Sequence, residues 1–401
     1  MIFASGSPQA RINKRVDMRI LNTLYYYRPH FSGLTVYTER LARILVSHGH
    51  QVTVLTSQYE QSLQPLEKMD GVDVIRVPVL FNVSKGPIMP TFLYRAARLI
   101  PEHDILHLHV PQLEAAPLSL LGRAFGVPVV MTYHCDLLLP SSPLNAVANW
   151  VSNLANMIST KTANVIVVNS RDYAEESSIL NKWLGKVDVI PPPIEMPEPD
   201  PLVIQSMRER FNIVQGQPVI GMAARLATEK GAEVLAQAMP IVLKEMPSAR
   251  VLYVGQHENV LGEEAYRRRL LPQIEALGDH WAFLGILQQS EFAAFFNLCD
   301  VTVLPSLNST ESFGMVQVES MLSGTPVVAS DLPGVRQPTT ATGMGLTFTP
   351  GDADKLAAAL LQVIRNPADY RRDRASVMAQ YSSEVVSAKY ETMFAELISK
   401  V

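Results

Sequence analysis

The strongest constraint on the fold is an alternation of short apolar runs with longer segments of helical period. The first half of the chain contains the runs MRILNTL, QVTVLTS, DILHLHV, VPVVMTYH and ANVIVVNS. Between the first two lies the amphipathic segment YTERLARILVSHGH, where Leu41, Ile44 and Leu45 share a face and Gly49 marks a stop. Strands that are apolar on both faces and separated by helices predict a parallel sheet covered on both sides.

A second series of the same kind begins after a proline-rich stretch at residues 187–201. Because proline fits neither a helix interior nor a central strand, this stretch predicts a linker between two α/β domains. We place an N-terminal domain at residues 18–190, the linker at 191–201 and a second domain at 202–380. Residues 1–17, which precede the first strand, are expected to be a disordered arm. The crevice between the domains, at the carboxyl ends of the strands, is the expected ligand site.

Charge and cysteine content exclude several classes of protein. The 34 basic and 38 acidic residues form no block of one sign, so the sequence does not predict a nucleic-acid partner. Cys135 and Cys299 lack the spacing of a disulfide scaffold or a zinc site, which favours a reducing cytoplasm. No run reaches the roughly 18 apolar residues of a membrane span, and the first residues do not resemble a signal peptide.

Anion-binding features occur at two places in the second series of strands. Arg225 follows a strand and Lys230 precedes a helix, although neither a GxxxxGK[ST] nor a GxGxxG motif is present. A further helix is expected to begin near Phe313, where the amides of Gly314 and Met315 would suit a phosphate. Together these groups predict a site for a diphosphate.

Two glutamates, Glu311 and Glu319, lie on either side of that expected helix start. On one helix they would be about 12 Å apart at ~1.5 Å per residue, whereas a retaining glycoside hydrolase needs carboxyl groups about 5 Å apart. A hydrolytic pair is therefore not favoured. Hydrogen bonding to the hydroxyls of a nucleotide sugar fits the spacing better.

Several motifs, in order along nearly the whole chain, resemble the retaining glycosyltransferases of the two-domain GT-B fold, family 4 in particular. NSTESFGMVQVESMLSG resembles the family's Glu-x7-Glu signature, GMAARLATEKG its Gly-Arg…Glu-Lys-Gly segment, and VVMTYHCD its histidine-bearing strand end. The resemblance implies two Rossmann-like domains around a cleft, with the acceptor on the N-terminal side and the donor on the C-terminal side. It also implies that residues 381–401 form a helix that crosses back to the first domain.

The resemblance further implies roles for the charged residues and the histidine. Arg225 and Lys230 would neutralise the donor diphosphate. Glu311 would bind a hydroxyl of the transferred sugar, and Glu319 would bind the ribose. His134 would lie beside the primary hydroxyl and the anomeric carbon of the sugar.

By the same resemblance, backbone groups complete the donor site. The amides of Phe313, Gly314 and Met315 would assist on the diphosphate. Gly33 would approach the phosphates when the domains close. Backbone at Gly285 and Leu287 would meet the nucleobase.

Three segments depart from the family pattern: Ser32-Gly33 stands where many members have two glycines, IPPPIE replaces Pro-Asn-Gly, and RQPTTATGMG is unlike the usual loop. Outside the motifs, His107 and His109 share a strand face and are interpreted as structural, because no third metal ligand is evident. Residues 80–100 mix aromatic, aliphatic and basic side chains, which fits either a packed helix or an element on a membrane surface.

We therefore predict a metal-independent, retaining transfer of a hexose from a nucleoside diphosphate sugar to an acceptor hydroxyl, with no cofactor. The acceptor is a glycan, a glycolipid or a small molecule, and the enzyme is expected in the cytoplasm, with peripheral contact at the inner membrane face as an alternative. A nucleotide-sugar epimerase of the same fold and a non-catalytic nucleotide-sugar-binding subunit remain alternatives, and a glycoside hydrolase is the weakest of them.

Overall fold

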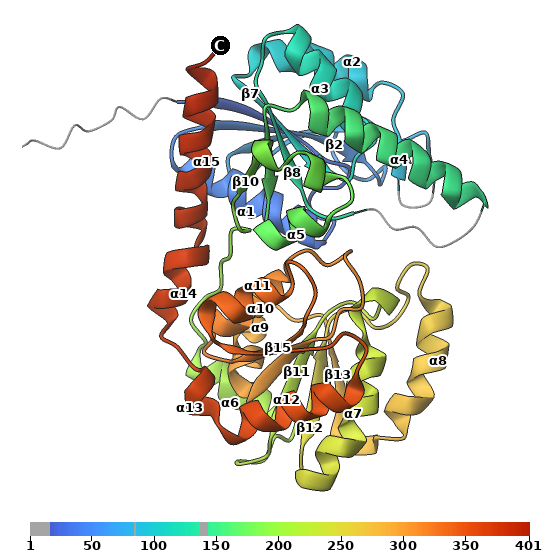
Figure 1. Ribbon diagram of the computed structural model, residues 1–401, viewed down its shortest axis with the longest axis vertical. Coiled ribbons are helices and arrows are strands. Elements are labelled where there is room, and N and C mark those ends of the chain that lie inside the picture. Colours follow the sequence, from blue (N-terminus) through green and yellow to red (C-terminus); the bar gives the residue numbers. More distant parts are fainter. Residues whose placement is uncertain (1–16, 84–85, 137–142) are drawn as a thin grey trace, which may run out of the picture.

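The computed structural model describes residues 17–83, 86–136 and 143–401 as two α/β domains, one above the other in Figure 1. Of residues 1–17, which we expect to be a disordered arm, residues 1–16 lie outside the described residues. Parallel sheets form the centre of each domain, as the alternation of apolar runs predicts.

The N-terminal sheet has the strand order β10-β9-β8-β7-β1-β2-β4-β3, and only β3 runs antiparallel to its neighbour. A separate small hairpin joins β5 to β6. The strands are β1 (Arg19–Thr23), β2 (Gln51–Gln58), β3 (Leu66–Met69), β4 (Val72–Pro78), β5 (Phe81–Val83), β6 (Gly86–Ile88), β7 (Ile105–Val110), β8 (Val129–Tyr133), β9 (Val165–Val168) and β10 (Val187–Val189). The helices are α1 (Gly33–Ser47), α2 (Phe92–Leu99), α3 (Ala115–Ala124), α4 (Pro143–Thr162) and α5 (Arg171–Glu176), with short 3-10 turns at Ile100–Glu102, Leu180–Lys182 and Leu184–Lys186.

The C-terminal sheet is parallel throughout, in the order β13-β12-β11-β14-β15-β16. Its strands are β11 (Val219–Ala223), β12 (Arg250–Val254), β13 (Trp281–Gly285), β14 (Val301–Leu304), β15 (Val327–Ser330) and β16 (Gly345–Phe348). The helices are α6 (Pro201–Arg210), α7 (Ala232–Glu245), α8 (Glu264–Glu275), α9 (Gln289–Leu298), α10 (Met315–Leu322), α11 (Arg336–Thr342), α12 (Ala353–Arg365), α13 (Pro367–Tyr370), α14 (Arg374–Tyr381) and α15 (Ser383–Ile398), with 3-10 turns at Thr228–Lys230 and Gly278–His280.

Burial explains why the runs read as continuously apolar. Every residue of β7, β8, β14 and β15 is buried, since helices cover both faces of each sheet. Each domain has core clusters on both faces of its sheet, so each buries its own apolar side chains.

The chain passes between the domains twice. Residues 191–200 run extended from β10 to α6, and Ile194 forms an isolated bridge with Ser382 on the returning chain. Helix α15 then lies along the N-terminal domain (Figure 1), where Tyr390 packs in the same core as α1. The Tyr390 and Tyr37 hydroxyls lie 2.6 Å apart.

Candidate functional site

The predicted site residues lie at the carboxyl ends of strands in both domains. His134 follows β8 of the N-terminal sheet, and Arg225 follows β11 of the C-terminal sheet. The Arg225 charge lowers the pKa of His30, a residue of the loop after β1, although burial contributes more to that shift. The two strand-end loops therefore face each other across the interdomain cleft.

Lys230 and Glu311 form an ion pair, with Nζ and Oε2 2.6 Å apart. Lys230 ends the turn before α7, and the next residue, Gly231, has φ +68° and lies so close to the Pro305 carbonyl that a Cβ would sit 2.0 Å from its oxygen. Glycine is required there because both the left-handed conformation and the close approach exclude a side chain. This packing brings Lys230 beside the loop that carries Glu311, 81 residues later in the chain.

Helix α10 begins where the sequence predicted an anion-binding helix start. Gly314 is its N-cap residue, with φ 78°, and a Cβ there would lie 2.2 Å from Leu304 Cδ2. Among the described residues, the amides of Phe313, Gly314 and Met315 donate no hydrogen bond to another protein group. Free amides at the positive end of a helix can bind an anion.

Arg225 pairs with Glu229 at 3.2 Å and keeps 45% of its side chain exposed. Gly285 ends β13, two strands away in the sheet, and its carbonyl accepts a hydrogen bond from the Gly255 amide at 2.8 Å. Gly255 in turn lies against the backbone of Ala224. The end of β12, which Gly255 follows, therefore lies between Gly285 and Arg225. Leu287 follows Gly285 on the same loop and packs against the core of this domain.

Glu319 lies in α10 and forms an ion pair with Arg40 of α1, in the other domain. The Arg40 Nη2 to Glu319 Oε1 distance is 2.7 Å, and the side chains are only 12% and 10% exposed. Arg40 Nη1 also lies 3.5 Å from the Pro193 carbonyl oxygen in the linker. The carboxylate predicted to bind ribose is therefore held by a cation from across the cleft.

Further contacts join the domains beside these pairs. A Cβ at Gly33 would lie 3.6 Å from Met315 Cε, so the start of α1 touches the start of α10. Ser312 Oγ donates to the His134 carbonyl and lies 3.3 Å from Asn169 Nδ2. The structure thus brings Gly33, His134, Phe313, Gly314 and Met315 to one interdomain boundary.

His134 belongs to a buried group of three histidines. Its Nε2 lies 3.0 Å from His109 Nδ1, and the ring centroids of His109 and His107 are 4.2 Å apart. Burial lowers the pKa of His134 to about 3 and that of His107 to about 3, and it lowers the pKa of His109 well below its usual value. All three rings are therefore neutral at physiological pH.

Cys135 follows His134 at the same strand end. Burial, with the nearby Glu311 charge second, raises the pKa of its thiol to about 12. The thiol is therefore protonated at neutral pH and is a poor nucleophile. The Glu311 effect also shows that this strand end faces the Lys230–Glu311 pair.

Arg40 and His109 are the residues of this boundary that sequence reasoning missed. Arg40 lies seven residues after Gly33, and Tyr37 lies four residues after it, so helical spacing puts all three on one face of α1. This helical spacing from Gly33 is the feature of the sequence that could have predicted Arg40 at the boundary. For His109, which the sequence analysis interprets as structural, no feature of the sequence indicates the contact with His134.

The described part of the chain contains neither a cluster of metal-ligating side chains nor a helix that could cross a membrane. Within residues 17–83, 86–136 and 143–401, no group of three or more His, Cys, Asp or Glu side chains could hold a metal ion. In the same residues, no helix combines the length and the apolar character that a bilayer crossing requires. His107 instead bonds to Thr132, with Nε2 and Oγ1 2.7 Å apart.

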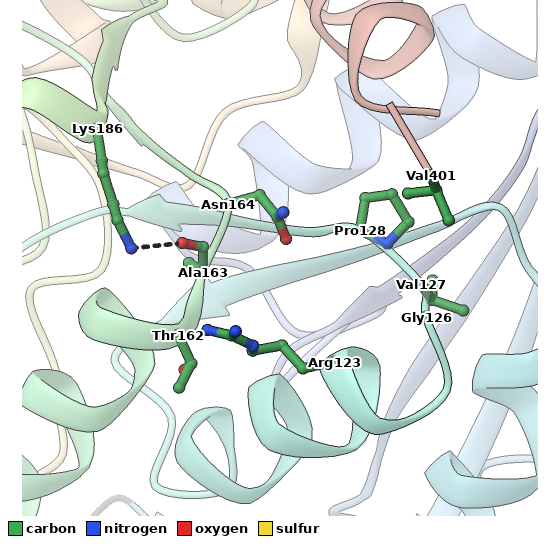
Figure 2. Close-up of a pocket in the computed structure, with 9 residues that line it drawn as sticks. All are labelled: Arg123, Gly126, Val127, Pro128, Thr162, Ala163, Asn164, Lys186 and Val401. Carbon is green, nitrogen blue, oxygen red and sulfur yellow. Dashed lines mark hydrogen bonds between the residues drawn. The ribbon is translucent and has the colours of Figure 1, made fainter. Parts of the chain in front are cut away.

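A surface hollow of about 430 Å³ lies away from this boundary, at the amino ends of β8, β9 and β10 (Figure 2). Arg123 and Lys186 line it, and Lys186 donates to the carbonyls of Lys161 and Ala163, at 2.7 and 3.0 Å. These carbonyls close the C-terminal end of α4, so Lys186 acts as a helix cap there. The hollow contains none of the predicted site residues.

Residues 80–100 form the β5–β6 hairpin and α2 rather than one continuous helix, with residues 84–85 outside the described residues. Helix α2 buries Phe92 and Ala96, so it packs on the domain as an ordinary helix. Its outer face and the hairpin expose Tyr94, Leu80 and Phe81.

Two family models match the chain. The model described as "Glycosyl transferases group 1" matches residues 203–382, and the "Glycosyl transferase 4-like domain" model matches residues 32–193. These ranges fall on the C-terminal and N-terminal domains respectively.

Characterised relatives match over much of the chain. It is 28% identical over 377 residues to a phosphatidyl-myo-inositol mannosyltransferase of Mycolicibacterium smegmatis, covering 90% of each chain. It is also 28% identical over 283 residues to a 2-deoxystreptamine glucosyltransferase of Streptomyces kanamyceticus, covering 66% of this chain and 69% of the relative.

Solved structures share the fold. Sucrose-phosphate synthase from Thermosynechococcus elongatus superimposes with a TM-score of 0.77 at 21% identity, covering 96% of this chain and all of the other. Anabaena HepE, solved with UDP and glucose, superimposes with a TM-score of 0.73 at 20% identity and the same coverage.

Proposed function

Because the chain belongs to the group 1, family 4-like glycosyltransferases and has their GT-B architecture, we propose that it moves a hexose from a nucleoside diphosphate sugar to an acceptor hydroxyl with retention of anomeric configuration. One observation carries the proposal. The Lys230–Glu311 pair, the free amides at the start of α10 and the His134 strand end meet at one boundary between the domains.

The departing diphosphate needs positive charge, which this boundary offers. Lys230 and Arg225 would contact the phosphates, and the amides of Phe313, Gly314 and Met315 would add hydrogen bonds at the helix start. Charge placed where negative charge develops lowers the barrier to bond breaking. These protein cations support a metal-independent reaction.

We propose retention without a covalent intermediate on Glu311 or Glu319. Glu311 pairs with Lys230 and Glu319 with Arg40, and both carboxylates are assigned to hydroxyl groups of the donor, so the proposed step needs no bond to either. In the proposed step, the bond from the anomeric carbon to the phosphate oxygen breaks. The acceptor oxygen bonds that carbon on the same face, and the acceptor proton passes to the leaving phosphate oxygen.

Glycolipids are the acceptor class that we propose to test first, in the cytoplasm at a membrane surface. Several relatives carry names that include phosphatidyl-myo-inositol or phosphatidylinositol, among them a GDP-mannose-dependent mannosyltransferase of Mycobacterium tuberculosis. On this chain, Leu80, Phe81 and Tyr94 are exposed on the N-terminal domain, near Arg95 and Arg98 of α2. Apolar side chains beside basic ones suit a peripheral contact with anionic lipid.

A donor screen tests the proposal. We expect thermal stabilisation by one of GDP-mannose, UDP-glucose, UDP-N-acetylglucosamine or ADP-glucose, and release of the nucleoside diphosphate when phosphatidylinositol, inositol phosphate or an aminocyclitol is added. NMR of the product then reads the anomeric configuration, and the reaction is repeated with EDTA. Retained configuration and EDTA resistance are expected.

Other outcomes would identify the alternatives. Conversion of the donor sugar without any acceptor would indicate an epimerase. Donor binding with no nucleoside diphosphate release for any acceptor would indicate a binding subunit. An inverted product or a glycosyl adduct on Glu311 would overturn the proposed mechanism.

A further inference from the structure

We infer that His109, backed by Asn22, is a positioning residue that keeps the single ring proton of His134 on Nε2 and leaves His134 Nδ1 as a hydrogen-bond acceptor. A catalytic role for this proton arrangement rests on the proposed function, whereas the positions of the protons do not depend on it.

The innermost partner is Asn22, on β1, whose Oδ1 lies 3.1 Å from His109 Nε2. An amide oxygen can only accept, so His109 Nε2 carries a proton and donates it. Both groups are buried, at 2% and 0% exposure, so water does not replace this bond.

His109 carries no second proton. A buried imidazolium without a carboxylate partner is disfavoured, and the buried rings of His107 and His134 lower the pKa of His109 further. Its Nδ1 is therefore an acceptor, and the nitrogen 3.0 Å from it, His134 Nε2, is the donor. Thr38 Oγ1 lies farther from His109 Nδ1, at 3.4 Å, and donates to the Leu34 carbonyl at 3.0 Å.

His134 then has one nitrogen left. Burial keeps its ring neutral, with a pKa of about 3, so Nδ1 carries no proton. Among the described residues no hydrogen bond engages Nδ1, and His134 keeps 9% of its surface exposed. Its carbonyl accepts from Ser312 of the other domain, which puts the residue at the cleft boundary.

The orientation of the ring is fixed as well as its proton. Tyr37 packs edge-on against His134, with centroids 4.8 Å apart and planes at 89°. The Tyr37 hydroxyl is in turn bonded to Tyr390 of α15, at 2.6 Å. A flip that exchanged the two ring nitrogens would break the bond to His109. The lone pair at Nδ1 is thus ready to accept from a hydroxyl of the donor sugar or the acceptor.

NMR of 15N-histidine-labelled full-length protein tests the inference. The chain has nine histidines, and the His134 signals are identified by their loss in His134→Gln. At neutral pH we expect a protonated, pyrrole-type Nε2 and an unprotonated, pyridine-type Nδ1. The reverse assignment would overturn the inference.

Two variants of nearly equal size separate positioning from packing. His109→Gln can accept from His134 and donate to Asn22, so it should preserve the His134 tautomer. His109→Leu removes the acceptor and should give a mixture of His134 tautomers. If His109→Leu does not fold, Asn22→Leu, which frees the His109 tautomer, should give the same mixture. An unchanged His134 signal in a folded Leu variant would disprove the inference.

Kinetics link the proton position to transfer. Loss of one well-placed hydrogen bond should lower kcat/KM of the Leu variant about tenfold, with the Gln variant within about threefold of the native enzyme. If the NMR result holds and no donor or acceptor supports transfer by the native protein, the proposed function fails and the proton assignment stands. Equal kcat/KM values for the Leu variant and the native protein would mean that His109 has no role in the transfer reaction.

Discussion

On the C-terminal side of the cleft, Lys230 and Glu311 carry opposite charges on side chains that are 21% and 18% exposed. On the N-terminal side, His134 and His109 are neutral, buried and bonded to each other. The difference fits what the proposed function would require of each side, a diphosphate on the C-terminal side and a sugar hydroxyl on the N-terminal side. A diphosphate must be able to displace or share a charged partner, and partly exposed groups lose little when they change partners. A sugar hydroxyl needs one fixed acceptor, which a buried neutral network supplies.

Removing Lys230 should give the largest effect, since in the proposed function its charge would act on the leaving diphosphate. We expect Lys230→Ala to lower kcat about 10²- to 10³-fold, the range seen when one stabilising donor of a transition state is removed. Steady-state kinetics with the identified donor measure this. Lys230→Arg is the matched control and should recover part of the rate, because it keeps the charge.

A kcat for Lys230→Ala within threefold of the native value would show that the C-terminal side does not act through this charge. Thermal unfolding of both variants checks that they are folded.

The next largest effect is expected from acid, which should lower the free energy of unfolding through the buried histidines of the N-terminal domain. His107 and His134 have folded-state pKa values of about 3, below the usual value of 6.5. Between these values the unfolded state binds more protons than the folded state, so their contribution is complete above about pH 6.5 and is lost as the pH falls toward 3. Each histidine should lower the free energy of unfolding by up to about 1.4 kcal/mol per pH unit in that range.

Urea unfolding from pH 7 to pH 5 measures this slope. His107→Gln should flatten it, because one neutral buried ring is removed. An equal slope in the variant would mean that His107 protonates in the folded state.

The Arg40–Glu319 pair joins the two sides and should show an intermediate effect. Glu319→Gln should weaken donor binding about tenfold, the value of one lost charge-assisted hydrogen bond. Calorimetry with the donor or its nucleoside diphosphate measures the affinity. A double-mutant cycle with Arg40→Gln should give a coupling energy for folding of about 1 kcal/mol, since the pair is little exposed. Additive effects would show that the pair contributes nothing across the domain boundary.

The smallest effect is expected at Glu229, which pairs with the exposed side chain of Arg225. Glu229→Gln should change the free energy of unfolding by less than about 0.5 kcal/mol, because a pair four residues apart with one exposed member contributes little. Donor affinity should stay the same or rise slightly, since Arg225 is freed for the phosphates. Urea unfolding and calorimetry test both statements, and a large loss of stability would mean that the pair is structural.

The sequence predicted the parallel sheets, because buried strands must be apolar on both faces and β7, β8, β14 and β15 are. It also placed the start of α10 within two residues, since Gly314 has no side chain and precedes an amphipathic run. The partners of the site residues were not predictable in the same way. Glu319 meets Arg40 across 279 residues, and that contact depends on how two domains dock. His109 lies on a buried strand face, as an ordinary core residue would. Only the pairing of β7 with β8 shows that it contacts His134.

Helix α15 has a consequence for synthesis of the chain on the ribosome. The core that contains Tyr37 and Leu41 of α1 also contains Tyr390, Phe394 and Leu397, near the C-terminus. The N-terminal domain precedes the C-terminal domain in the chain, yet it lacks one covering helix until residues 383–398 have been translated. The C-terminal domain, made later, has its strands and helices α6 to α14 complete before α15 is released. All the residues of the N-terminal core are therefore available only after the C-terminal domain has been made, and truncation after residue 382 would expose that core rather than shorten the other domain.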